Sequence, residues 1–319
     1  MTGKVTVDYE ASCSIVEGIR GGSPFVTPND LLSNCIKAKQ GINIRQDVQT
    51  EVQEMGDFLE TPLAQKMAMD LGLTNLETNI PYAVTHPKLP LNGSIDAKAF
   101  ASNILVKHDG NRIFTENKED ILLNGSGIIE IKTTAHYPPD EDGFPPLWRG
   151  VTQAKSLMAC TDYSWAIVGV LYRSTFYKYY VMRRDHIFEK ELTTLIQDFN
   201  RRIQEEDYYP PVTTSDAAKV YKKVEDGEIH SLNKDDSYKL TRLLSIKEQK
   251  KELKKEEDEL TLAIQKEMKE ATLGRNDQYE VTWGWRNYKA QPEKIVPAKE
   301  GYTIRSGLTI KRLNDEEKL

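Results

Sequence analysis

This sequence has few cysteines and no long hydrophobic run. Its three cysteines, Cys13, Cys35 and Cys160, stand far apart, so neither a disulfide framework nor the paired spacing of a zinc site is present. This usage is typical of a reducing compartment. No apolar run approaches the roughly 20 residues that a membrane-spanning helix needs, and the first residues lack the apolar core of a secretory signal. We therefore expect a cytoplasmic protein without a membrane partner.

Several catalytic signatures are also missing. The sequence has no GxxxxGK[ST] phosphate-binding loop and no serine nucleophile elbow, so ATP-driven and serine-hydrolase chemistry are not expected. The five histidines are scattered without the spacing of a metal-binding pair. The net charge of −6 does not indicate a nucleic-acid partner. It does not exclude one either, because acidic metal ligands can coexist with a local basic cleft.

The hydrophobic patterns of the first two thirds of the chain predict an α/β fold, a mixed central sheet flanked by helices. A turn-rich insertion is expected over residues 107–127, between two strands. Helices are expected at 28–40, 47–71, 150–161 and 187–206, and extended segments near 76–85, 91–98, 102–107, 127–134, 164–172 and 174–184.

The composition changes after residue 207. A polar segment, 208–236, is expected to be a linker between a main domain, 1–207, and an accessory region, 237–319. Residues 237–273 predict one long, charged helix. Its apolar positions recur every seven residues but alternate with Lys250 and Glu257, which argues against a long coiled coil. The alternating segments "YEVTWGWRNYKA" and "GYTIRSGLTIKRL" predict a terminal β-hairpin.

The stretch "GIIEIKTT", residues 127–134, has the composition of a buried strand but contains Glu130 and Lys132. Side chains alternate across a strand, so these two charges share one face while Ile129 and Ile131 face the core. Burying two charges is expensive unless something compensates them. A structural salt bridge is one explanation, and a bound cation beside the carboxylate is the other.

Further polar residues stand in comparable settings. Asp96 lies in the apolar segment "LNGSIDAKAF", Glu60 on the helix 47–71, and Gln153 near the start of the helix 150–161. This order, with the blocks "GSIDA", "IIEIKTT" and "RGVTQAKSLMACTDYSWAIVGVLY", resembles the PD-(D/E)XK nuclease superfamily. More narrowly, it is similar to the YqaJ-type viral-recombinase branch that includes phage lambda exonuclease. The resemblance covers roughly residues 15–185, although Ile95 replaces the usual proline before Asp96.

The resemblance implies a restriction-endonuclease-like core with a Mg²⁺ site in which Mn²⁺ can substitute. The implied ligands are the carboxylates of Asp96 and Glu130 and the carbonyl of Ile131, with Glu60 joining directly or through water. These are the hard oxygen ligands that Mg²⁺ prefers. The implied catalytic set comprises these acids, Lys132, which would position or deprotonate the attacking water, and Gln153, which would brace the site.

Two rivals for these roles remain open. Asp96 and Lys98 repeat the acid-x-lysine spacing, so Lys98 competes with Lys132, although the strand around Lys132 is more apolar. Glu77 is an alternative acidic partner, but its place at the start of a strand favours exposure to solvent.

Candidate DNA contacts lie in three places. The resemblance implies that Arg20 and Thr27 grip a terminal phosphate, and the alternative for Thr27 is a helix cap. Arg173 belongs to the aromatic and basic stretch "LYRSTFYKYYVMRR", and Arg149 ends a proline-rich loop; both can meet phosphates or bases. The alternatives are a sheet strand with tyrosines on both faces for the stretch, which we favour, and a disordered excursion for the loop. Lys155 completes the predicted set.

The function implied by the resemblance is a metal-dependent DNA exonuclease that resects linear double-stranded DNA in phage-type recombination. It would work in the cytoplasm of a bacterial or phage-infected cell. Its relatives suggest a homo-oligomeric ring, such as a trimer, and a single-strand-annealing protein as partner. Two alternatives stay open: a structure-specific or restriction-like endonuclease, and a catalytically silent DNA-binding scaffold.

Overall fold

The computed structural model describes residues 6–44, 50–138, 143–221 and 231–284. Contacts divide the chain into two units, Met1–Tyr221 and Lys222–Leu319. Within the described ranges, no helix combines the length and hydrophobicity that crossing a bilayer requires.

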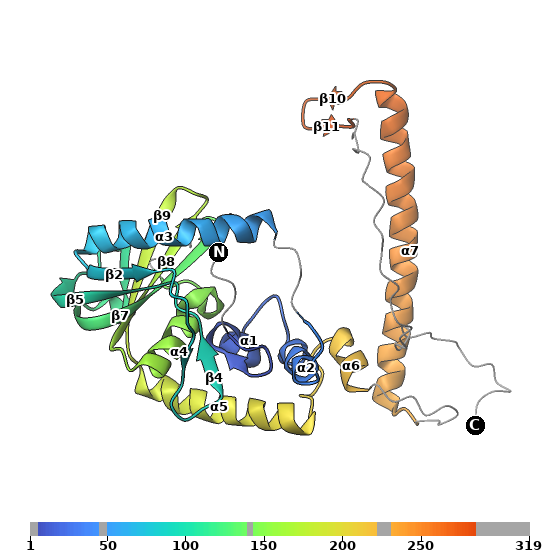
Figure 1. Cartoon of the computed structure of the whole chain (residues 1–319). Coiled ribbons are helices and arrows are strands. Elements are labelled where there is room, and N and C mark those ends of the chain that lie inside the picture. Colours follow the sequence, from blue (N-terminus) through green and yellow to red (C-terminus); the bar gives the residue numbers. More distant parts are fainter. Residues whose placement is uncertain (1–5, 45–49, 139–142, 222–230, 285–319) are drawn as a thin grey trace. The chain divides into compact units, whose positions relative to one another are not determined.

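The first unit is built on a six-stranded mixed sheet in the order β2-β5-β7-β8-β9-β6 (Figure 1). The central strand β7 pairs in parallel with β8, where Glu130 lies opposite Val168. On its other side β7 pairs antiparallel with β5, where Ala97 lies opposite Ile129. This register places Asp96, the residue before β5, opposite Glu130. The strands span Thr74–Thr78 (β2), Ala97–Val106 (β5), Ile113–Thr115 (β6), Ile121–Thr134 (β7), Trp165–Tyr172 (β8) and Phe176–Arg183 (β9).

Helices cover both faces of this sheet, with α3 (Glu51–Leu71) on one and α4 (Thr152–Thr161) and α5 (His186–Glu205) on the other (Figure 1). Ile129 and Ile131 belong to the core beneath α3, as predicted from their alternation. Ile128 belongs to the core beneath α4 and α5. Glu130 and Lys132 therefore share the α4 side of β7, where Glu130 is buried and Lys132 is partly exposed.

Local signals explain where the helices begin and end. Thr27 caps α2 (Pro28–Lys39) through a capping box with Asp30, which satisfies backbone donors that the first turn leaves free. Thr50 forms the same arrangement with Gln53 at the start of α3. Gly72 ends α3 with a left-handed φ of 69°, a conformation that glycine adopts without steric cost.

A smaller sheet, β1-β4-β3, leads the chain into the site. Strand β4 ends at Gly93, three residues before Asp96, and a Cβ added there would lie 2.6 Å from Leu157 and 2.8 Å from the Cys13 sulfur. Glycine is needed because the backbone runs directly against these side chains. The strands span Ala11–Ser12 (β1), Val84–Thr85 (β3) and Leu91–Gly93 (β4), and the short helices η1 and α1 span Cys13–Ile15 and Val16–Ile19.

Two segments differ from the sequence prediction. The stretch 107–127 is no turn-rich insertion, because it contains β6, the short helix η2 (Glu116–Lys118) and the first half of β7. Buried Ile121 and Leu123 place that half of β7 in the sheet. Residues 208–221 belong to the segment predicted as a linker with partial order; they include α6 (Thr214–Val220) but pack on α2, where Asn29 exchanges hydrogen bonds with the backbone of Tyr209.

The second unit contains the long helix α7 (Lys234–Met268) and a hairpin of β10 (Leu273–Arg275) and β11 (Glu280–Thr282). Met268, at the end of α7, is buried and lies beside Gly274. A charged helix and a hairpin were both predicted. The hairpin, however, pairs β11 with β10, while the predicted partner "GYTIRSGLTIKRL" lies outside the described residues.

Candidate active site

Asp96 and Glu130 meet where β5 begins beside β7. The backbone N–H of Ile131 donates to Oδ2 of Asp96 over 2.8 Å, which fixes this carboxylate next to the peptide that follows Glu130. The contact follows from the strand register, because Asp96 directly precedes Ala97, the partner of Ile129. Two acidic residues separated by 33 other residues thus lie side by side.

The carboxylate of Glu130 is buried without full compensation. Glu130 is 0% exposed, and its Oε1 accepts a hydrogen bond from the Lys132 ammonium. Its Oε2 has no hydrogen-bond partner among the described residues. Burial, reinforced by the negative charge of Asp96 and opposed by Lys132, raises the pKa of Glu130 well above its usual value. A buried, unpaired carboxylate oxygen is costly, so this position favours a bound cation.

Lys132 is the cation that the chain itself supplies. Its side chain is 32% exposed, so the pair meets solvent through Lys132. Burial alone would lower the pKa of Lys132, but the carboxylates of Glu130 and Asp96 outweigh it and raise the pKa above its usual value. Lys132 is therefore an ammonium in this arrangement, suited to donating hydrogen bonds.

Glu60 faces the same cluster from α3. Burial, together with the negative charges of Asp96 and Asp57, raises the pKa of Glu60 to about 8, and Lys132 opposes this shift. Glu60, Asp96, Glu130 and Lys132 thus interact with one another, and their catalytic and metal-binding roles stay a prediction. Asp57 was not predicted. It lies three residues before Glu60, so both acids are on one side of the helix, and this spacing could have been read from the sequence.

The donor set fits a hard divalent cation. Within the described residues, no three His, Cys, Asp or Glu side chains form a ready-made metal centre. Mg²⁺ does not require one, because it keeps several waters and is often held by one or two carboxylates. Asp96 and Glu130 supply these, and the buried Oε2 of Glu130 is an oxygen without a partner. Coordination by the Ile131 carbonyl and by Glu60 stays a prediction.

Gln153 lies at the start of α4, next to a residue that contacts a buried acid, Glu17, of α1. Gln153 is half-buried in the first turn of α4, which packs on β7, and its bracing role stays a prediction. Thr152, the preceding residue, donates its hydroxyl proton to Glu17 over 2.7 Å. Glu17 is buried and was missed, although a carboxylate inside the apolar stretch "SIVEGI" is the same kind of signal as Glu130.

Thr27 and Lys155, two predicted DNA contacts, are engaged within the protein. The Thr27 hydroxyl caps α2 and donates to the buried Asp216 over 2.7 Å, which matches the helix-cap alternative. The Lys155 ammonium lies 2.8 Å from Glu116 and 3.1 Å from Asp185. Their contact with DNA remains a prediction, and any such contact would compete with these bonds.

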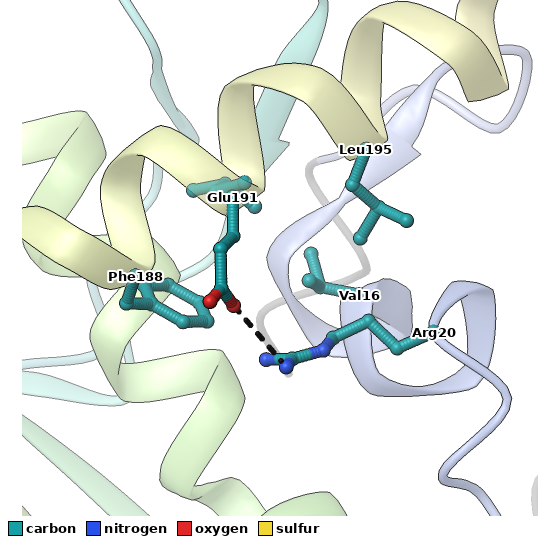
Figure 2. A pocket seen from close by; sticks show the side chains of 6 residues that line it. Val16, Arg20, Phe188, Glu191 and Leu195 are labelled. Atoms are coloured by element: carbon teal, nitrogen blue, oxygen red, sulfur yellow. Dashed lines mark hydrogen bonds and ion pairs between the residues drawn. The ribbon is translucent and has the colours of Figure 1, made fainter.

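Arg20 lies beside a small cavity between α1 and α5. Figure 2 shows its guanidinium directed at Glu191, 3.4 Å away, with Phe188 on one side and Val16 and Leu195 on the other. The cavity has a volume of about 110 Å³. The ion pair offsets the positive charge of Arg20, so a phosphate would have to displace Glu191 to use it fully.

Arg149 and Arg173 each stack on an aromatic ring. The Arg149 guanidinium lies 4.5 Å from the Trp148 ring centroid, and that of Arg173 lies 4.2 Å from the Tyr137 centroid. Arg173 was predicted from an aromatic and basic stretch and Arg149 from the end of a proline-rich loop, and the contact of both with DNA stays a prediction.

The rival lysine has a different environment. Lys98 pairs with Glu77 over 3.0 Å and donates to the Tyr82 hydroxyl over 3.2 Å, whereas Lys132 contacts Glu130. The sheet register produces this difference, because Lys98 lies opposite Glu77 on β2.

No protein-family model and no curated protein sequence matches the chain. Among solved structures, it is similar to an alkaline exonuclease (LHK-Exo) from Laribacter hongkongensis, with 15% identity and a TM-score of 0.44 over 63% of this chain and 90% of that one. The complex of LHK-Exo with dAMP gives 16% identity and a TM-score of 0.43 over 62% and 89%. A phage-related exonuclease from Haemophilus somnus 129PT gives 12% and 0.40 over 62% and 96%. These likenesses concern the course of the backbone, whereas the site rests on contacts within this chain.

Proposed function

We propose that this chain is a metal-dependent deoxyribonuclease that degrades linear double-stranded DNA from its ends. Mg²⁺ is the proposed cofactor, and Mn²⁺ can replace it. The proposal places the chain in the PD-(D/E)XK superfamily, on the motifs that its sequence shares with the YqaJ-type branch.

The buried carboxylate of Glu130 is the observation that carries this proposal. A salt bridge alone would leave its Oε2 without a partner and would leave the charge of Asp96 beside it. A divalent cation would both contact this oxygen and offset the charge of Asp96. Glu60, Asp96, Glu130 and Lys132 also interact electrostatically although they come from α3, from the residue before β5 and from β7, an arrangement that a single structural ion pair does not require.

Each residue has a distinct task in the proposed reaction. Asp96 and Glu130 would hold the cation, and the Ile131 N–H keeps Asp96 oriented. A bound Mg²⁺ would supply Lewis-acid stabilisation of the phosphate charge and a more acidic water. Lys132, as an ammonium, would donate a hydrogen bond to a phosphate oxygen or to the attacking water and offset the charge that develops there. Glu60 would hold a proton or a water at the edge of the cluster.

The direct test is degradation of end-labelled linear duplex DNA by the purified full chain, with and without a 5′ phosphate, compared with a covalently closed circle. We expect the linear DNA to be degraded with Mg²⁺ or Mn²⁺, EDTA to stop the reaction, and the circle to survive. Asp96→Asn should abolish degradation while the protein remains folded. Full activity of Asp96→Asn would contradict the proposal.

Two other results would redirect it. Cutting of the closed circle would favour an endonuclease, because a circle offers no end. Tight DNA binding without turnover under any divalent cation would favour a catalytically silent scaffold. The labelled products also report the polarity of degradation.

The assembly implied by the resemblance belongs to the same proposal. We propose a homo-oligomeric ring that threads DNA and acts with a single-strand-annealing protein. Light scattering of the full chain would give the number of subunits. A ring enzyme should remain on one DNA molecule through many cleavage steps in the presence of excess unlabelled competitor, whereas a monomer that releases DNA after each step would contradict the ring.

A further inference from the structure

A short turn connects the acidic site to a partly exposed aromatic cluster. The π-type turn η3 (Leu147–Val151) leads from the loop after β7 into α4. Its Gly150 has a φ of 92°, and a Cβ added there would lie 3.3 Å from Cγ of Lys132. A side chain at residue 150 would be strained and would press on Lys132. The turn therefore lies against the candidate catalytic lysine, and Trp148 is only two residues before this contact.

Three side chains form the cluster, which we call the stacking platform: Phe25, Trp148 and Arg149. The Phe25 and Trp148 rings meet edge to face with centroids 5.2 Å apart, and the Arg149 guanidinium lies over the Trp148 ring at 4.5 Å. Phe25 is 75% exposed, and Leu147 beside the platform is 48% exposed. Phe25 is thus open to solvent, while Trp148 and Arg149 are half-buried beside it.

The turn that carries the platform is firmly held. The Arg149 N–H donates to the Pro146 carbonyl over 2.8 Å, and Thr152 donates to buried Glu17 over 2.7 Å. These bonds fix both ends of the turn, so a flat ligand would meet surfaces that are already ordered. Such preorganisation lowers the entropy lost on binding.

We propose that the stacking platform binds an unpaired base of the DNA strand whose phosphate is held near Lys132. Aromatic rings and guanidinium planes stack on nucleobases whatever their sequence, and the arginine also attracts the phosphate backbone. Bases inside a duplex already stack on their neighbours, so only a frayed or single-stranded base can use the platform. This inference rests on the proposed nuclease function and specifies its substrate as a duplex with an unpaired end.

Binding, rather than cleavage, tests this inference. The affinity of the full chain is measured by fluorescence anisotropy, with Ca²⁺ in place of Mg²⁺ and again in EDTA, for a blunt duplex and for the same duplex with a single-stranded overhang. The wild type should prefer the overhang. Trp148→Ala should weaken overhang binding by roughly fivefold to a hundredfold, the range that a lost base stack produces, and leave blunt-end binding unchanged.

Three variants guard against misfolding and indirect effects. Trp148→Phe keeps a ring and should retain most of the preference. Phe25→Ala changes an exposed side chain and should lose part of it. Trp283→Ala, which removes a 46% exposed tryptophan in the second unit, is the matched control and should bind like the wild type.

A second readout reports the stack itself. 2-Aminopurine at the unpaired end should be quenched by the wild type and by Trp148→Phe but not by Trp148→Ala. The inference is overturned if the wild type shows no preference for the overhang, or if Trp148→Ala binds the overhang as the wild type does. A preference that persists in a protein without nuclease activity would instead remove the proposed function and leave the binding site standing.

Discussion

Lys98 and Lys132 each follow a carboxylate by two residues, on neighbouring strands of the same sheet. Lys132 lies against the fully buried Glu130, within the field of Asp96 and Glu60. Lys98 pairs with Glu77, which is 60% exposed, and the hydrogen bonds that Lys98 donates to Tyr82 and Glu77 raise the pKa of Lys98 to about 12. The sequence spacing is the same, but only one lysine shares its site with a carboxylate that lacks compensation.

This difference teaches that the acid-x-lysine spacing alone does not define a catalytic pair. What distinguishes the pair on β7 is burial of its acid and the approach of further acids from other elements. An exposed ion pair contributes little and needs nothing else. A buried carboxylate with an oxygen that lacks a hydrogen-bond partner is costly, and the cation that we propose would offset this cost.

The largest expected effect separates the two lysines. Lys132→Met should lower the initial rate of linear duplex degradation by at least about 100-fold, because it removes the hydrogen-bond donor for the developing charge. Lys98→Met should remain within about threefold of the wild type. Initial rates at saturating Mg²⁺ measure both. Equal losses of degradation rate in the two variants would contradict this comparison, and Lys98 would again be a candidate for the catalytic lysine.

The second-largest effect is expected when the buried carboxylate of Glu130 is neutralised, because the protein should then lose cation binding. Mn²⁺ or Mg²⁺ should raise the melting temperature of the wild type, because a ligand that binds only the native state stabilises it by about 2.7 kcal/mol at 100 times its Kd. Glu130→Gln should lose this shift, since a neutral amide is a poor ligand. Glu77→Gln is the matched control and should keep it. Melting curves with and without the cation decide, and an intact shift in Glu130→Gln would be contrary to the account.

A smaller effect should appear in the pH dependence of stability without metal. Burial raises the pKa of Glu60 from its ordinary 4.5 to about 8, so the native state holds a proton that the unfolded chain has lost in this interval. Unfolding free energy measured in EDTA should therefore fall as pH rises from about 5 to 8. Glu60→Gln should flatten this slope, while Glu54→Gln, an exposed residue of the same helix, should not. A slope that is unchanged in Glu60→Gln would show that Glu60 ionises without penalty.

The smallest effect is expected at the outer pair. Glu77→Gln should change the free energy of unfolding by less than about 1 kcal/mol, because the side chain is 60% exposed and such pairs are screened by water and salt. Urea denaturation measures this difference. A loss of several kcal/mol would mean that the Lys98 pair is structurally as important as the pair on β7.

Much of the fold could be predicted from local patterns. The helices α2 and α5 follow from amphipathic spacing and from caps such as Thr27 and Asp185, and β8 follows from an unbroken apolar run. The insertion predicted over 107–127 was wrong. Asn124 and Gly125 look like turn residues there, but tertiary pairing with β5 keeps residues 121–127 in the strand.

The site residues could be predicted where a charged side chain stands in an otherwise apolar segment. Glu130 and Asp96 stand out because each is a charge in an apolar segment, and the register of β5 on β7 places them opposite each other. The approach of Glu60 depends on how α3 crosses the sheet, which periodicity does not determine. The same holds for Glu17 and Gly150, whose contacts with Thr152 and Lys132 join segments distant in the chain.

The most direct test of the central claim is an anomalous difference map from crystals of the full chain soaked in Mn²⁺. The account predicts a peak in contact with both Asp96 and Glu130, and its disappearance in crystals of Glu130→Gln. A map with no peak at these carboxylates, or a peak that persists in Glu130→Gln, would contradict it.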